Sequence, residues 1–292
     1  MDEHLEKLYL AFQTLPSPEH IKGCGCSSCV SSDELKSLKE SDPKTLTADQ
    51  LFGYVHDALS TVGSEADFTF YLPHIMRAWS DELYDQNDRQ FTDLVHTAMM
   101  RENFFHEKLK PELRDAIIEF MRVKLLERIG AEKSLHIRGS TGTHLWPQVF
   151  ASYGWVTDDV PQLWSKWWAM PTVGHAISVI QWVSCLICDP KNNPVFEPWT
   201  PSGGGGPFEL WQFSDRSYSA RWRPSNVQFL QAILTDNYLR QSIEKVRDVL
   251  KETANVMVVE KVRDLFETRL EDTRDRCRET ISRLGKLHLN PS

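Results

Sequence analysis

The sequence lacks every complete catalytic signature that residue spacing alone would identify. It has no G-x-S-x-G nucleophile elbow, no protein-kinase set and no dinucleotide-binding fingerprint, and His106-Glu107 lacks the second histidine of H-E-x-x-H. These absences exclude the common hydrolase, kinase, dehydrogenase and zincin patterns. A catalytic site would therefore have to be assembled from residues that are far apart in the chain.

Positive charge is also scarce. The 292 residues include 33 lysines and arginines against 41 aspartates and glutamates, so the formal net charge is -8 at pH 7. Because nucleic-acid affinity depends on clustered lysine and arginine, we expect no nucleic-acid partner. With 41% hydrophobic and 25% charged residues, the composition is that of an ordinary globular protein.

Targeting and membrane segments are absent from the pattern as well. The N-terminal stretch "MDEHLEKLYLAFQTL" carries acids where a secretory signal carries bases, which predicts a cytoplasmic protein. One run of 22 residues, from Trp167 to Cys188, has no charge. It contains Pro171 and several polar residues, so we expect a buried core helix and no membrane partner.

Helical periodicity dominates the regular parts of the sequence. Thr47 and Gln50 form a capping-box pair before an apolar stripe that Gly63 is expected to end. The next stripe contains Pro73, which should kink or restart its helix. Further stripes follow up to residue 130 and over 259–284. The expected fold is therefore mostly α and built of helical hairpins, with helix in more than half of the residues.

The arrangement of these hairpins has two alternatives. They begin near residues 47 and 88, a spacing of about 40 residues that matches HEAT or armadillo repeats. No residue-level similarity accompanies this spacing, so an irregular helical bundle is the other alternative. In both cases we expect a single mainly helical domain over residues 1–292. Its parts are a Cys-rich segment (1–45), a helical body (46–189), an irregular insertion (190–224) and C-terminal helices (225–285).

The insertion and its surroundings are rich in tryptophan, glycine and proline. Nine of the ten tryptophans lie in residues 144–222, and most of their rings are expected in the core. Four consecutive glycines precede "FELWQF" and "YSARWR", two β-prone runs that predict a small β-hairpin. The glycines lack the context of a phosphate-binding loop. Trp199 and Trp211 have glycine or proline nearby, and they are the candidates for binding a partner.

A second concentration of unusual residues lies in "HIKGCGCSSC", residues 20–29. His20, Cys24, Cys26 and Cys29 supply four nitrogen and sulfur ligands, the number that a closed structural zinc site needs. A solvated thiol-rich loop and a disulfide or redox role are the alternatives.

A second cysteine pair lies far along the chain. Cys185 and Cys188 could join the N-terminal cluster, but both lie in an uncharged helical stretch where core packing explains them.

The cysteine-rich turn also carries a resemblance. "GCGCSSC" followed by "TVGSEADFTFYLPHI" resembles a group of uncharacterised bacterial cytosolic proteins with a Cys-rich N-terminal turn and a T-x-G-x3-DF-x2-(F/Y)LP-x-I segment. The matching positions are Thr61, Gly63, Asp67, Phe68 and Pro73. The resemblance implies a bacterial, cytosolic and helical protein, and it implies no activity.

Two functions follow from these observations. The first is a non-catalytic protein of regulatory or immunity type that binds another protein and contains a structural zinc site. The alternative is an enzyme of unknown class, with His144 and His175 near the Gly-rich loop as candidate residues.

Overall fold

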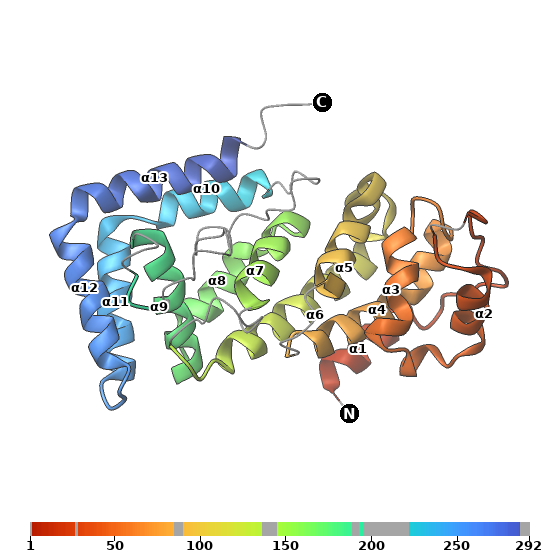
Figure 1. Ribbon diagram of the computed structural model, residues 1–292, viewed down its shortest axis with the longest axis horizontal. Helices are drawn as coiled ribbons and strands as arrows, with labels where there is room; N and C mark the ends of the chain where they lie inside the picture. Colours follow the sequence, from red (N-terminus) through yellow and green to blue (C-terminus); the bar gives the residue numbers. More distant parts are fainter. Residues whose placement is uncertain are drawn as a thin grey trace. The chain divides into compact units, whose positions relative to one another are not determined.

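The protein is all-α in the part of the chain that the structure describes. The structure is a computed structural model, 74% helical with 13 α-helices and no strand among the described residues (Figure 1). This confirms the prediction of helix in more than half of the residues. The described residues are 2–26, 29–84, 90–135, 145–188, 193–195 and 222–286.

The described residues contain helices along the chain from residue 3 to residue 286. They are α1 (Glu3–Phe12), α2 (Ser32–Glu40), α3 (Ala48–Asp57), α4 (Glu65–Glu82), α5 (Gln90–Met100), α6 (Pro111–Gly130), α7 (Leu145–Val156), α8 (Val160–Trp168), α9 (Val173–Ile187), α10 (Pro224–Ile233), α11 (Asp236–Leu250), α12 (Val256–Thr268) and α13 (Leu270–Lys286). Three short helical turns complete the set: η1 (Pro43–Thr45), η2 (Arg101–Asn103) and η3 (Phe104–Lys108).

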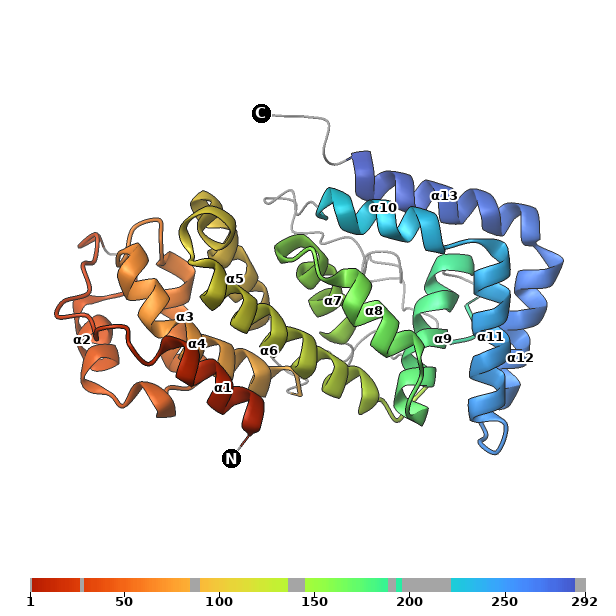
Figure 2. The same ribbon diagram turned by 180° about the vertical axis from the view of Figure 1, so that it is seen from behind.

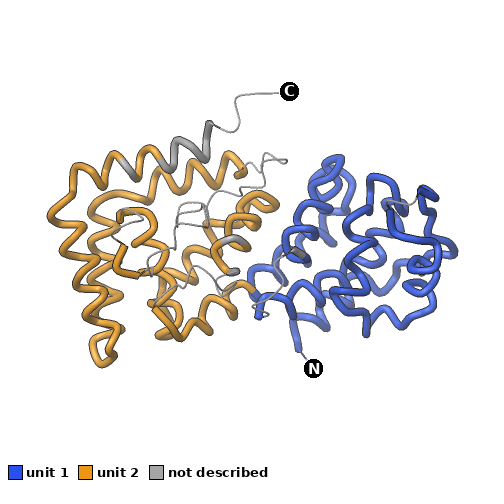
Figure 3. Tube along the Cα trace, viewed as in Figure 1, with its two compact units in different colours: residues 1–124 blue, residues 125–292 orange. Residues whose placement is uncertain are grey.

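The chain forms two compact units. Unit 1 comprises Met1–Lys124 and unit 2 comprises Leu125–Ser292, and their boundary falls within α6 (Figure 3). The single-domain organisation and the HEAT-like stacking remain predictions.

The start of α3 confirms the predicted cap, and its end differs from the prediction. The Thr47 hydroxyl accepts the N–H of Gln50 at 3.3 Å, and the Gln50 side chain accepts the N–H of Thr47 at 2.8 Å. The predicted end at Gly63 is wrong because α3 ends at Asp57, after which the backbone of Ala58 turns extended, with ψ 143°. A tight turn then joins α3 to α4.

Pro73 lies inside α4, which continues as one helix from Glu65 to Glu82. The proline therefore does not restart the helix, although it removes one backbone N–H donor from it. The predicted apolar stripe of this helix is buried at every position. Its residues are Phe68, Tyr71, Leu72, Ile75, Met76 and Trp79.

Buried tryptophans form part of the core of unit 2. The rings of Trp164 and Trp168 stack with centroids 3.7 Å apart. The indole N–H of Trp168 donates to the Ser242 hydroxyl at 2.8 Å, and that of Trp167 donates to the Ser178 hydroxyl at 2.7 Å, so these two buried donors are satisfied. The buried tryptophans of this unit are Trp146, Trp164, Trp167, Trp168, Trp182 and Trp222.

The uncharged run from Trp167 to Cys188 is divided between two helices. It covers the end of α8, a bend and all of α9, and α9 is buried from Gly174 to Ile187. No described helix is by itself long and apolar enough to cross a membrane. Helices α8 and α9 are long and apolar enough only when they are counted together, and a 117° bend separates them.

Several predicted features lie outside the described residues. They are the β-hairpin, the four-glycine stretch, His144, Trp199 and Trp211.

Candidate metal site

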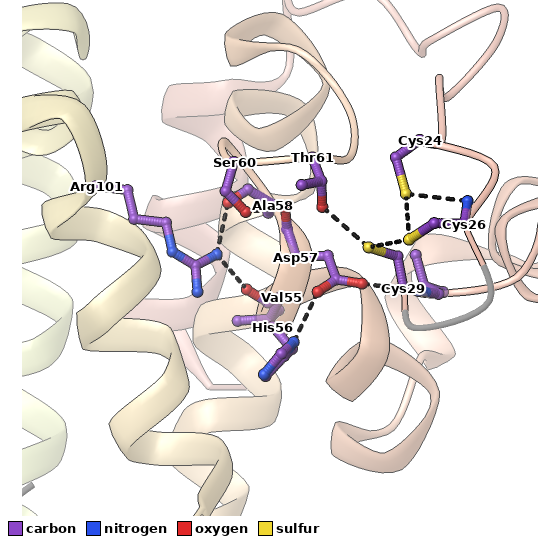
Figure 4. A network of polar contacts seen from close by, with 11 residues as sticks. Cys24, Cys26, Cys29, Val55, His56, Asp57, Ala58, Ser60, Thr61 and Arg101 are labelled. Carbon is purple, nitrogen blue, oxygen red and sulfur yellow. Dashed lines mark hydrogen bonds and ion pairs between the residues drawn. The ribbon is translucent and has the colours of Figure 1, made fainter. Parts of the chain in front are cut away.

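Three of the four predicted metal ligands meet in the loop between α1 and α2. The Sγ atom of Cys26 lies 3.0 Å from that of Cys24 and 3.1 Å from that of Cys29 (Figure 4). All three sulfur atoms lie within 4.8 Å of one another. Cys24 and Cys26 are exposed and Cys29 is half-buried. Because thiolate sulfur is a preferred ligand of zinc and other soft ions, this cluster could hold a metal ion.

A left-handed glycine produces the turn that brings the first two thiols together. Gly25 has φ +74°, a conformation that L side chains rarely adopt. This turn lets the N–H of Cys26 approach the Cys24 sulfur at 3.4 Å. The convergence of these two cysteines therefore depends on glycine at position 25.

Asp57, the last residue of α3, anchors the second end of the loop. One of its carboxylate oxygens accepts the N–H of Val30 at 2.7 Å, and the other lies 2.7 Å from Nδ1 of His56. Asp57 is only 7% exposed. Burial alone would raise its pKa, but the hydrogen bonds from Val30 and His56 lower the pKa below its ordinary value. The carboxylate is therefore ionised at neutral pH and fixes the residue that follows Cys29.

A second tether holds the loop before the cysteines. The N–H of Gly63 donates to the carbonyl of Lys22 at 2.8 Å. The Thr61 hydroxyl lies 3.4 Å from the Cys29 sulfur, on the same turn after α3 (Figure 4). The cysteine loop is thus attached on both sides to the end of α3 and the turn that follows it.

Arg101 stabilises this end of α3 from the opposite side. Its guanidinium donates to the carbonyl of Ala58 at 2.6 Å and to that of Val55 at 3.2 Å (Figure 4). Carbonyls at a helix C-terminus lack partners within the helix, so a cation that binds two of them stabilises the terminus.

The thiols also influence one another's protonation. The Thr61 hydroxyl acts to lower the pKa of the Cys29 thiol, but the hydrogen bonds with Cys24 and Cys26 raise it to about 12. Cys29 is therefore protonated at neutral pH without a cation, and a bound metal would have to displace this proton.

His20 is not part of the group of converging ligand atoms. The group comprises only the three cysteines among the described residues. The His20 side chain is exposed, and it has no hydrogen bond or ion pair with any described residue. Cys185 and Cys188 lie at the end of α9 in unit 2 and are buried.

His175, a candidate of the enzyme alternative, lies at the start of α9. Its Nδ1 atom is 2.8 Å from the hydroxyl of Thr172, which caps this helix. Burial lowers its pKa, so the ring is neutral at pH 7. This arrangement gives His175 a structural contact at the helix start.

Asp57 is the part of the site that the sequence pattern did not reveal. Acidic residues are common on helix surfaces, and Asp57 is separated by 27 residues from its backbone partner Val30. Its position directly before a tight turn is the only local signal, and it does not identify the partner.

Comparison with known proteins gives no relative for this chain: no family model, no curated protein and no solved structure matches it.

Proposed function

We propose that the chain is a non-catalytic helical protein that binds another protein, and that a structural zinc ion on Cys24, Cys26 and Cys29 holds its N-terminal loop. The convergence of the three sulfur atoms within 4.8 Å carries the metal part of this proposal. Tetrahedral zinc with bonds of about 2.3 Å requires sulfur atoms about 3.8 Å apart. The observed 3.0 and 3.1 Å separations would need to widen by less than about 1 Å.

The surroundings support a structural role for the ion. No described residue between Gln13 and Ser31 is buried, so this segment has little apolar packing to hold it. The hydrogen bonds to Asp57 and Gly63 fix its two sides. A metal ion bound by three loop residues would supply the missing stabilisation, as it does in small zinc domains.

His20 is proposed as the fourth ligand. It precedes Cys24 by four residues in a segment without helix or strand, and no hydrogen bond or ion pair with a described residue restrains its ring. Moving this segment would bring the imidazole to the thiols and close the coordination shell. A closed shell leaves no position for a catalytic water, which agrees with a structural ion.

The protein-binding part of the proposal has separate support. The chain consists of packed helices, and its sequence contains no complete catalytic signature. Trp199 and Trp211 are the proposed contact residues, because tryptophan often anchors protein interfaces.

Elemental analysis of the full chain, purified without chelator or metal-affinity tag, tests the metal site. We expect about one zinc per chain, lost in Cys26→Ser, weakened in His20→Ala and retained in the control Cys277→Ala. Absence of zinc, with three freely titrating thiols in the loop, would contradict the proposal.

The partner is tested by affinity capture with the full chain as bait. Trp199→Ala with Trp211→Ala should lose a stoichiometric partner and keep the zinc. Retention of the same partner by this double variant would exclude these residues as the contact.

A further inference from the structure

A cavity of about 590 Å³ lies in unit 1 where α1 and η1 meet α4. Its walls come from α1, from the chain just after this helix, from Lys44, and from α4. Helices α1 and α4 pack against each other beside it (Figure 2). The volume falls within the range of small-molecule sites, which is about 300 to 1,000 Å³.

The body of this cavity is aromatic and aliphatic. The rings of Tyr9 and His74 are tilted by 40° with their centroids 5.1 Å apart, and the Phe70 ring centroid lies 6.0 Å from that of His74. Leu10 stands at the same cavity with 59% of its surface exposed, one of few large apolar side chains in the described chain with such exposure. Pro73 adds a further apolar surface from α4. A hydrocarbon group in the cavity would therefore contact apolar atoms from two helices.

One cation in the cavity, that of Lys44, forms no ion pair with any described residue, although the Asp42 carboxylate lies nearby and accepts the backbone N–H of Lys44 at 3.0 Å. The ammonium of Lys44 lies 5.6 Å from the centroid of the Tyr9 ring. Glu6 is also at the cavity, on the exposed outer turn of α1, and it is not paired with Lys44. A ligand with a negative group could thus gain an interaction that no described side chain already makes.

A buried polar group in the cavity wall also lacks a partner. His74 is 8% exposed, and its Nδ1 atom has no hydrogen bond. Burial, followed by the charge of Arg77, lowers the pKa of His74 to about 4, so its ring is neutral at pH 7. The neutral ring can face an apolar group without the cost of desolvating a charge.

We propose that this cavity binds a medium-chain carboxylate, with its carboxylate group at Lys44 and its hydrocarbon chain between Tyr9 and Phe70. The unpaired ammonium selects the negative head, and the aromatic walls with Leu10 bury the chain. This site is independent of the metal cluster and of the proposed protein partner.

Calorimetric titration of the full chain with octanoate tests this proposal, with octanol and octylammonium as matched ligands. Octanoate should bind more tightly than either matched ligand, and its affinity should fall as the salt concentration rises. Hexanoate, octanoate and decanoate should gain up to about fourfold in affinity per methylene group. Selective NMR signals of the His74 ring should shift on titration and locate the ligand.

Variants of exposed residues separate the contributions of head group and chain. Lys44→Gln should weaken octanoate about fivefold and leave octanol unchanged, whereas Glu6→Gln should strengthen octanoate. Leu10→Glu should weaken octanoate through both lost apolar contact and charge repulsion. The proposal is overturned if octanoate does not shift the His74 signals, if Lys44→Gln binds octanoate like the wild type, or if octylammonium binds more tightly.

Discussion

The carboxylate of Asp57 accepts the backbone N–H of Val30 at 2.7 Å and so joins the end of α3 to the residue after Cys29. The two residues are 27 positions apart, and the bond belongs to a carboxylate that is 7% exposed. A charged acceptor of this kind forms a stronger hydrogen bond than a neutral one, so this contact is a firm attachment of the cysteine loop.

Replacement of this anchor should loosen the loop. In Asp57→Asn the acceptor keeps an oxygen but loses its charge, and we expect the free energy of exchange protection at the Val30 amide to fall by about 1 kcal/mol because a charge-assisted hydrogen bond becomes a neutral one. Hydrogen exchange of the Val30 amide measures this change. The control Asp49→Asn lies exposed in the first turn of the same helix and should leave the exchange unchanged. Equal exchange rates in both variants would show that Asp57 does not hold the loop.

The left-handed turn at Gly25 leads to a prediction about metal affinity. The methyl group that Gly25→Ala adds would have no neighbouring atom within 4 Å. The only cost of this substitution is therefore the conformational strain at φ +74°. This strain is about 1 to 2 kcal/mol for an L residue, and the free loop can relax it whereas the metal-bound loop cannot. We expect zinc affinity to fall about 5- to 30-fold.

Asparagine provides the matched substitution at this position. Because it tolerates the left-handed conformation better than alanine, Gly25→Asn should retain most of the affinity. Competition with a chromophoric chelator measures both variants. Equal affinities for alanine and asparagine would mean that the turn is not needed for metal binding.

The helices were predictable because their signal is local. The stripe from Phe68 to Trp79 repeats at the helical period, and its positions are buried as that period predicts. The end of α3 was mispredicted because it depends on contacts that are distant in sequence. Arg101 binds the carbonyl of Ala58, and Asp57 binds Val30, which no spacing rule connects.

The candidate metal site likewise contains residues whose convergence is a local property of the sequence and residues whose positions depend on the tertiary structure. Cys24, Cys26 and Cys29 lie within six residues, so the glycine-rich spacing was sufficient to predict their convergence. The position of His20 depends on the path of an irregular segment, which residue types do not determine. The role of Asp57 depends on the packing of that segment against α3, and this packing appears only in three dimensions.

Two glycines in unit 2 allow a close approach between the end of α6 and the start of α9. A Cβ atom at Gly174 would overlap the carbonyl oxygen of Gly130, a backbone atom that cannot move aside cheaply. Gly174→Ala should therefore lower the free energy of unfolding by about 3 kcal/mol. Gly53→Ala is the control, because its Cβ would meet only side-chain atoms of Val30, the nearer of them at 3.3 Å. Thermal unfolding compares the two, and an equal melting temperature for both would contradict the backbone approach seen here.

The buried histidine of α5 gives unit 1 a predictable dependence on pH. His96 is fully buried beside Trp79, with ring centroids 5.9 Å apart, and neither ring nitrogen has a side-chain hydrogen-bond partner. Burial lowers its pKa from 6.5 to about 3. Between these two values the unfolded chain binds one more proton at this position than the folded chain does. Its contribution to stability is thus fully present above pH 6.5 and is lost as the pH falls towards 3.

This linkage can be measured by replacing the ring with an apolar side chain. From about pH 6 to pH 4, His96 should contribute a loss of about 1.4 kcal/mol of unfolding free energy per pH unit in the wild type. His96→Leu removes the titrating group. The unfolding free energy of this variant should therefore fall less steeply with decreasing pH than that of the wild type, by about 1.4 kcal/mol per pH unit. Urea unfolding at a series of pH values gives both slopes. The comparison of slopes is unaffected by a constant change in packing energy, so identical slopes would show that His96 is not the group that destabilises unit 1 in acid.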